Sequence, residues 1–139
     1  MFSLSEFLWV VSVNGSQGYI SDCYNTGDIG PDIFTNGMGV FFAFNEGVIV
    51  NSYSAVVPKY NDIGDRIFGY GNNYGKVLNC YYLIPWDDFT GKGICYGDNT
   101  AIGCTAEQMK DKSTFKVFDF DKIWKFDSES DYPYPVLTG

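Results

Sequence analysis

The sequence contains no histidine, which removes the side chain that most often serves as a general base and as a metal ligand. No lysine or arginine occurs before Lys59, so the first 58 residues carry five acidic side chains and no basic ones. The whole chain of 139 residues has a net charge of −8. This balance argues against direct binding of nucleic acid or of an anionic membrane, because both present negative charge.

The one-signed charge of the amino-terminal half has two interpretations. It either serves solubility or presents an acidic surface to a basic protein partner. On the second interpretation, the candidate partner-binding residues are Asp22, Asp28, Asp32 and Glu46.

Long apolar runs are also missing. The run at residues 7–11 has five residues, against the ~20 that a membrane-spanning helix needs. The first residues lack the basic region of a secretory signal peptide. As written, the chain is expected in the cytoplasm, or at the cell surface if it is a fragment of a longer exported protein, and its location stays open.

What the sequence does contain is a repeat. Residues 18–24, 47–53 and 75–81 align without gaps on the pattern G-x-[IV]-x-[DN]-[CS]-Y, at offsets of 29 and 28 residues. Periods of roughly 20–50 residues are typical of solenoids, propellers and other repeat arrays. The unit is too short for a four-stranded propeller blade, but it suits one turn of a parallel β-helix.

We therefore predict an all-β fold, a short β-solenoid of about three 28–29-residue repeats whose equivalent residues stack in columns. Small or β-branched side chains should recur in register at the inward positions. A polar ladder of Asp22, Asn51 and Asn79 is expected at a corner of the stack. The predicted structural columns are Ile20, Ile49 and Val77; Cys23, Ser52 and Cys80; and Tyr24, Tyr53 and Tyr81.

The repeats also resemble a known family. Residues 22–29 and 79–82 are similar to GLUG-motif repeats of large bacterial surface proteins, including adhesin-like proteins. Residues 105–110, 118–121, 123–125 and 132–137 are similar to the segment that closes such arrays, so the resemblance covers roughly residues 10–137. It implies a right-handed parallel β-helix used for display and binding. Such repeats also occur in some IgA-cleaving metallopeptidases, but the resemblance does not imply peptidase activity here, since the zinc motif H-E-x-x-H needs histidine.

The chain is predicted to be one domain, residues 1–139, in four parts. Residues 10–84 hold the repeats, 85–104 form an irregular loop, and 105–139 form a carboxy-terminal cap over the open end of the stack. Thr105 and Gln108 fit a capping box, which predicts a short helix near residues 105–113. The apolar residues 1–9 are expected to fold back as an amino-terminal cap on a monomer; a homodimer through them is the alternative.

The four cysteines include no C-x-x-C pair, and no histidine is present to activate a catalytic thiol. Cys23 and Cys80 share a column two layers apart, which at ordinary strand spacing is about 9.6 Å. A disulfide tolerates Cα separations up to about 7 Å, so we expect reduced thiols at all four positions. We expect no cofactor and no metal.

Two acidic segments are candidates for catalysis or for metal binding. Asp87 and Asp88, beside Trp86, could form a sugar-hydrolase pair, but adjacent residues of an extended strand point to opposite faces. Residues 127–131 alternate acidic side chains and could hold calcium, although a solvated acidic loop is the simpler interpretation. We therefore predict that the protein is not an enzyme.

Two functional hypotheses remain open. The first is a non-enzymatic binding module that acts by protein–protein interaction through its acidic surface, as part of an adhesin-like surface protein. The second is a stand-alone acidic inhibitor from a phage or mobile element, which mimics nucleic acid and occupies the basic groove of a nucleic-acid enzyme. Anti-CRISPR and anti-restriction proteins are of this kind. The similarity to GLUG-motif repeats favours the first hypothesis. The absence of basic residues from the first 58 positions favours the second.

Overall fold

The fold is mostly strand with very little helix. It was obtained as a computed structural model, which describes residues 13–15, 17–26, 41–56, 68–73, 75–84, 86–87, 89, 93–94, 97 and 100–139. The predicted amino-terminal cap or dimer contact, residues 1–9, lies outside the described residues.

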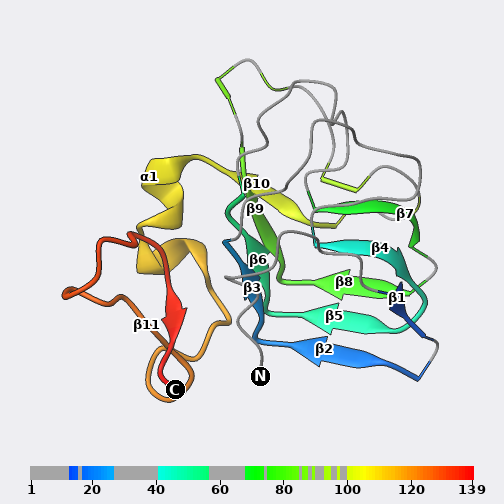
Figure 1. The fold of residues 1–139 in the computed structure, drawn as a ribbon, viewed down its shortest axis with the longest axis horizontal. Coiled ribbons are helices and arrows are strands. Elements are labelled where there is room, and N and C mark those ends of the chain that lie inside the picture. The colour runs from blue at the N-terminus through cyan, green and yellow to red at the C-terminus, as the bar shows by residue number, and fades with distance from the viewer. Residues whose placement is uncertain are drawn as a thin grey trace.

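Each of the three repeats contributes one strand to each of three parallel sheets (Figure 1). The first sheet contains β1 (Val13–Asn14), β4 (Phe42–Asn45) and β7 (Gly69–Asn73). The second sheet contains β2 (Tyr19–Ser21), β5 (Val48–Val50) and β8 (Lys76–Leu78). The third contains β3 (Tyr24–Asn25), β6 (Tyr53–Ser54), β9 (Tyr81–Leu83) and β10 (Ile102–Cys104).

The strands pair in the register that the sequence columns predict. Ile20 faces Ile49 and Ile49 faces Val77 across the second sheet, while Tyr53 pairs with both Tyr24 and Tyr81 in the third. Ile49 and Val77 are fully buried because alternate residues of a strand point to opposite faces and these point inward. The repeat spacing of 29 and 28 residues therefore equals the chain length from one strand to its neighbour in the stack.

The polar corner positions share an uncommon backbone conformation. Asp22, Asn51 and Asn79 have φ angles of 53°, 51° and 54°, in the left-handed region. Asp and Asn are the non-glycine residues that enter this region at least cost, since their short side chains bond to nearby backbone. The aspartate or asparagine of the repeat is thus selected by the turn between the second and third sheets.

The glycine that opens the motif is explained by a close backbone approach. A Cβ atom on Gly75 would overlap the carbonyl oxygen of Gly47 in the layer below. The Lys76 N–H donates to that same oxygen at 2.8 Å. The two layers are therefore in direct backbone contact at this position, and only glycine fits there.

Residues 102–104 correct the prediction of an irregular loop over 85–104. They form β10, which pairs in parallel with β9 so that Ile102 faces Tyr81. Ala101 then occupies the layer above Cys80, and the Thr100 hydroxyl donates to the Val77 carbonyl. Thr-Ala-Ile replaces the [DN]-[CS]-Y corner of the repeat, so the sequence pattern did not reveal this additional layer.

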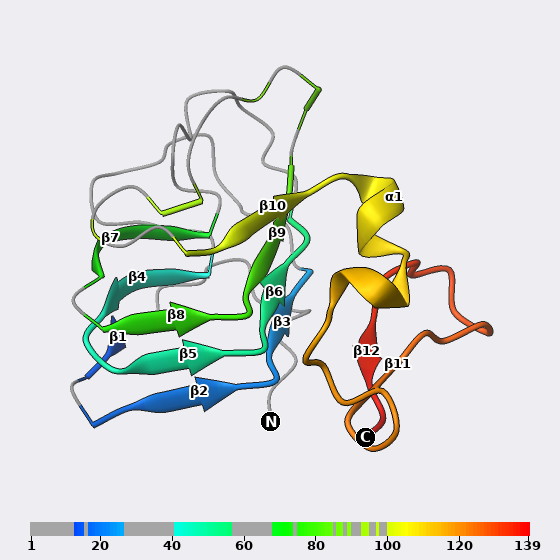
Figure 2. The ribbon, with the colours of Figure 1, turned by 180° about the vertical axis from the view of Figure 1, so that it is seen from behind.

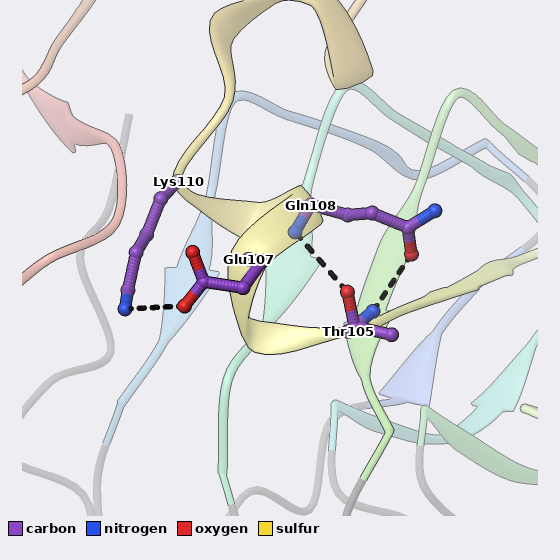
Figure 3. Close-up of polar contacts among 4 residues, drawn as sticks. All are labelled: Thr105, Glu107, Gln108 and Lys110. Atoms are coloured by element: carbon purple, nitrogen blue, oxygen red, sulfur yellow. Dashed lines mark hydrogen bonds and ion pairs between the residues drawn. The ribbon is translucent and has the colours of Figure 1, made fainter.

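The carboxy-terminal segment, residues 105–139, contains the predicted capping box (Figure 3). The Gln108 N–H donates to Thr105 Oγ1 at 3.2 Å, and the Thr105 N–H donates to Gln108 Oε1 at 2.9 Å. These bonds begin α1 (Ala106–Met109), which the 3-10 helix η2 (Lys112–Thr114) follows. β11 (Trp124–Lys125) and β12 (Val136–Leu137) then pair antiparallel.

This segment was predicted to cover the open end of the stack, and it does not. It lies along the side, against the outer face of the third sheet, and both ribbon views show it beside β3, β6 and β9 (Figures 1 and 2). The third sheet therefore separates two cores. Its inner face packs on Ile49, Val77 and Phe68, and its outer face packs on Met109, Phe115 and Trp124.

Among the residues that the structure describes, no helix has the length and apolar character needed to cross a membrane.

Candidate functional site

The four acidic residues proposed to bind a partner differ in their surroundings. Asp22 is buried: its carboxylate accepts the indole N–H of Trp124 at 3.2 Å and the Ser21 hydroxyl at 2.9 Å. Its side chain therefore fastens the carboxy-terminal segment to the first repeat instead of facing solvent. Glu46 is exposed in the turn between β4 and β5, and Asp28 and Asp32 lie outside the described residues.

A second acidic surface is formed by residues 127–131. Figure 1 shows the connection between β11 and β12 extending away from the sheets. Glu129 and Asp131 are exposed there, and the Asp127 carboxylate accepts the Glu129 N–H at 3.1 Å, which holds the turn. We refer to residues 127–131 as the acidic loop.

The exposed side chains of Glu46, Glu129 and Asp131 form no ion pair with another described residue. Within the described ranges, the single salt bridge joins Lys110 and Glu107 on α1, at 3.1 Å. The described residues also contain no group of three or more His, Cys, Asp or Glu side chains that could hold a metal ion. The calcium alternative for the acidic loop therefore gains no support from the geometry, and the loop presents negative charge to solvent.

The cysteine column is inside the stack, on the inner face of the third sheet. The side chains of Cys23, Ser52 and Cys80 each donate to the carbonyl oxygen two residues earlier. Cys23, Cys80 and Cys104 are thiols and not disulfides, as predicted, while Cys95 lies outside the described residues. Burial raises the pKa of Cys80 to about 12 and that of Cys104 to about 11, so neither is an activated nucleophile.

The tyrosine column is on the outer face of the third sheet, under the carboxy-terminal segment. Tyr24 and Tyr53 stack with ring centroids 5.4 Å apart. The Tyr53 hydroxyl is 2.8 Å from the Tyr132 hydroxyl and donates to the Pro135 carbonyl. Because Tyr24, Tyr53 and Tyr81 are all buried, the column is a core and not a platform for a ligand.

Of the candidate carboxylate pair Asp87 and Asp88, the structure describes Asp87. Asp87 is exposed, Asp88 lies outside the described residues, and Trp86 packs edge-on against Phe89 at 5.7 Å. Trp86 belongs to the apolar residues at the edge of the inner core, so its ring has a packing role.

Alkaline pH should destabilise the protein through its buried thiols and phenols. Burial raises the pKa of Cys80 from 9.0 to about 12, and burial together with Tyr132 raises that of Tyr53 well above 10.0. The folded state thus favours the neutral forms, so the contribution of these groups to the free energy of unfolding is complete below pH 9 and is lost as pH rises towards 12. Each such group contributes a slope of roughly 1 kcal/mol per pH unit.

Urea unfolding at pH 8 and pH 11 measures this effect. The matched variant is Cys80→Ser, because Ser52 occupies the equivalent position in the second repeat and does not titrate in this range. Cys80→Ser should weaken the loss of stability between the two pH values. Equal pH dependence in both proteins would show that Cys80 is not buried as a neutral thiol.

The chain was compared with known proteins in three ways, and no protein-family model, curated protein or solved structure matches it. The resemblance to GLUG-motif repeats therefore rests on the residues of the repeat alone.

Sequence reasoning did not identify Trp124 and Tyr132 as partners of the first two repeats. Trp124 belongs to an apolar stretch of the sequence, and such a stretch predicts burial without indicating a partner. Nothing local indicated that its N–H would meet Asp22, which is 102 residues earlier.

Proposed function

We propose that this protein is a non-enzymatic binding module whose parallel layers are the turns of a short right-handed β-solenoid. Its stacked repeats, of the GLUG-motif type, form a rigid scaffold that presents acidic side chains to a basic protein partner. One observation carries the proposal. The described loops expose carboxylates, and the described residues form a single ion pair, which involves none of the carboxylates on those loops.

The scaffold supports this proposal in a specific way. Exposed acidic side chains lie on turns that are held by hydrogen bonds from backbone N–H groups to side-chain oxygens. The Gly47 N–H donates to Asn45 Oδ1 next to Glu46, and the Glu129 N–H donates to Asp127 Oδ1 in the acidic loop. Charges on rigid turns lose little entropy when a partner binds. Complementary charge mainly accelerates association and selects against partners of the wrong sign.

The inhibitor hypothesis makes the same use of the charge but names a narrower partner, a nucleic-acid enzyme. The absence of basic residues before Lys59 favours it, because a surface of one sign can imitate a phosphate backbone. Competition separates the two: DNA at a concentration near the Kd of the enzyme for DNA should displace the protein from such an enzyme, whereas displacement from any other basic partner should need far more DNA.

The proposal predicts that binding weakens with salt. Proteins retained by the immobilised chain at 50 mM NaCl should be basic, and their association should slow steeply by 500 mM, since exposed charges are screened over ~10 Å at 0.1 M. The triple variant Glu46→Lys, Glu129→Lys and Asp131→Lys should slow association about tenfold or more, with an unchanged melting temperature.

The control is Lys125→Glu, an exposed position on β11 where added negative charge should not slow association. Asp22 is excluded from this test because its carboxylate holds Trp124. Retention of neutral or acidic partners with affinity unchanged by salt would contradict the proposal.

A further inference from the structure

A groove of about 470 Å³ opens on the carboxy-terminal segment beside η2, within residues 111–120. Only residues of the carboxy-terminal segment line it, and two of them, Phe115 and Phe118, also pack on Tyr81 of the third repeat. Its volume is within the range of about 300–1,000 Å³ that small-molecule sites occupy. Two lysines and three phenylalanines line it.

Two ammonium groups give the groove a positive charge. Lys112 and Lys116 are both exposed, and the one ion pair of the described residues, Lys110 with Glu107, involves neither. The Asp111 carboxylate also lines the groove, but it accepts the N–H and the hydroxyl of Ser113, at 2.9 and 2.8 Å. These hydrogen bonds hold the pKa of the Asp111 carboxyl below its usual value. They also fix the carboxylate against the backbone of the Asp111–Ser113 turn.

The phenylalanines give the groove an apolar floor. Phe115 and Phe118 are buried beneath it, whereas Phe120 is half-buried and reaches the surface. The Phe118 ring stacks on Trp124 with centroids 4.7 Å apart and lies 6.4 Å from Phe120. The floor is therefore fixed by the outer core of the protein and is formed before any ligand arrives.

Lys112 already uses this floor. Its ammonium nitrogen lies 5.3 Å from the centroid of the Phe120 ring, in a cation–π contact. The contact places a positive charge directly over the half-buried Phe120 ring, which also stacks on Phe126 with ring centroids 5.6 Å apart. A ligand with one anionic group and one flat ring can meet both at once.

We propose that this groove binds a small organic anion that carries a planar ring, with the anionic group between Lys112 and Lys116 and the ring against Phe120. An inorganic anion would gain only exposed ion pairs, which contribute little. A neutral ring would lose the charge contact. On a protein with a net charge of −8, the two contributions are needed together.

Nuclear magnetic resonance titration of the ¹⁵N-labelled chain tests this site. The probes are 2-naphthoate and 2-naphthyl phosphate, which distinguish carboxylate from phosphate, with neutral 2-naphthol and acetate as controls for charge and ring. Both anionic probes should shift the amide signals of residues 111–120, and both controls should bind at least about tenfold more weakly. The better probe identifies the preferred anion.

The lysines are tested by Lys112→Met and Lys116→Met, which keep the apolar stem. Each should weaken 2-naphthoate binding roughly twofold to fivefold, as expected for exposed charge pairs. Lys110→Met is the matched control, since Lys110 pairs with Glu107 outside the groove and its loss should leave affinity unchanged. Binding of 2-naphthol as tight as that of 2-naphthoate, equal affinity in all three variants, or shifts confined to other residues would overturn the proposal.

Discussion

Replacing Trp124 by alanine should lower the free energy of unfolding by about 3–5 kcal/mol, the usual cost of deleting a fully buried large aromatic side chain. Trp124 is completely buried, stacks on Phe118 at 4.7 Å, and lies 5.9 Å from both Tyr24 and Tyr53. Its truncation would leave a cavity between the third sheet and the carboxy-terminal segment. Domains have stabilities of about 5–15 kcal/mol, so this single change removes a large share.

Urea denaturation followed by far-ultraviolet circular dichroism measures the loss. Trp124→Phe keeps most of the packing but removes the donor to Asp22, and should cost about 1–3 kcal/mol because a buried carboxylate oxygen loses its partner. Lys125→Ala, at the exposed next position, should change stability by less than about 0.5 kcal/mol. A loss under about 1 kcal/mol for Trp124→Ala would show that the segment is not docked on the sheet.

Replacing Gly75 by alanine should destabilise the protein by about 3 kcal/mol, at the upper end of the usual cost of overpacking. The added Cβ would overlap the carbonyl oxygen of Gly47, and backbone cannot rotate away as a flexible side chain can. The layers would have to separate locally, which would weaken the bond from the Lys76 N–H to that oxygen.

Gly15→Ala is the matched control for this change. A Cβ at Gly15 has no atom within 4 Å, so the same substitution should be neutral or stabilise by about 0.5 kcal/mol through the unfolded chain. The difference between the two variants in thermal unfolding isolates the steric contribution. Equal melting temperatures would contradict the stacking of Gly75 on Gly47.

The repeat columns could be predicted because their causes are local. A glycine, a β-branched residue and a left-handed corner recur at fixed positions, and each has a reason within its own layer or the next one. The polar corner was predicted at the correct residues, though the left-handed φ of Asp22, Asn51 and Asn79, and not stacking alone, explains the choice of residue.

The rest depended on contacts that no local pattern encodes. The repeat pattern did not predict β10, because Thr100, Ala101 and Ile102 occupy the corner positions that the [DN]-[CS]-Y residues occupy in the other layers. The side-on docking of the carboxy-terminal segment follows from a fit between tyrosines of three repeats and a distant aromatic cluster. The sequence could not show that Asp22 is unavailable to a partner, because the residue that helps to bury it, Trp124, is 102 positions away.

The side-on position of the carboxy-terminal segment has a consequence for how the protein unfolds. Repeat arrays whose units touch only their neighbours can lose one unit at a time from either end. Here, one segment packs against Tyr24, Tyr53 and Tyr81, and so against all three repeats at once. Fraying of the first repeat must break the Trp124 contacts that also support the second. The segment thereby turns a modular stack into a single cooperative unit.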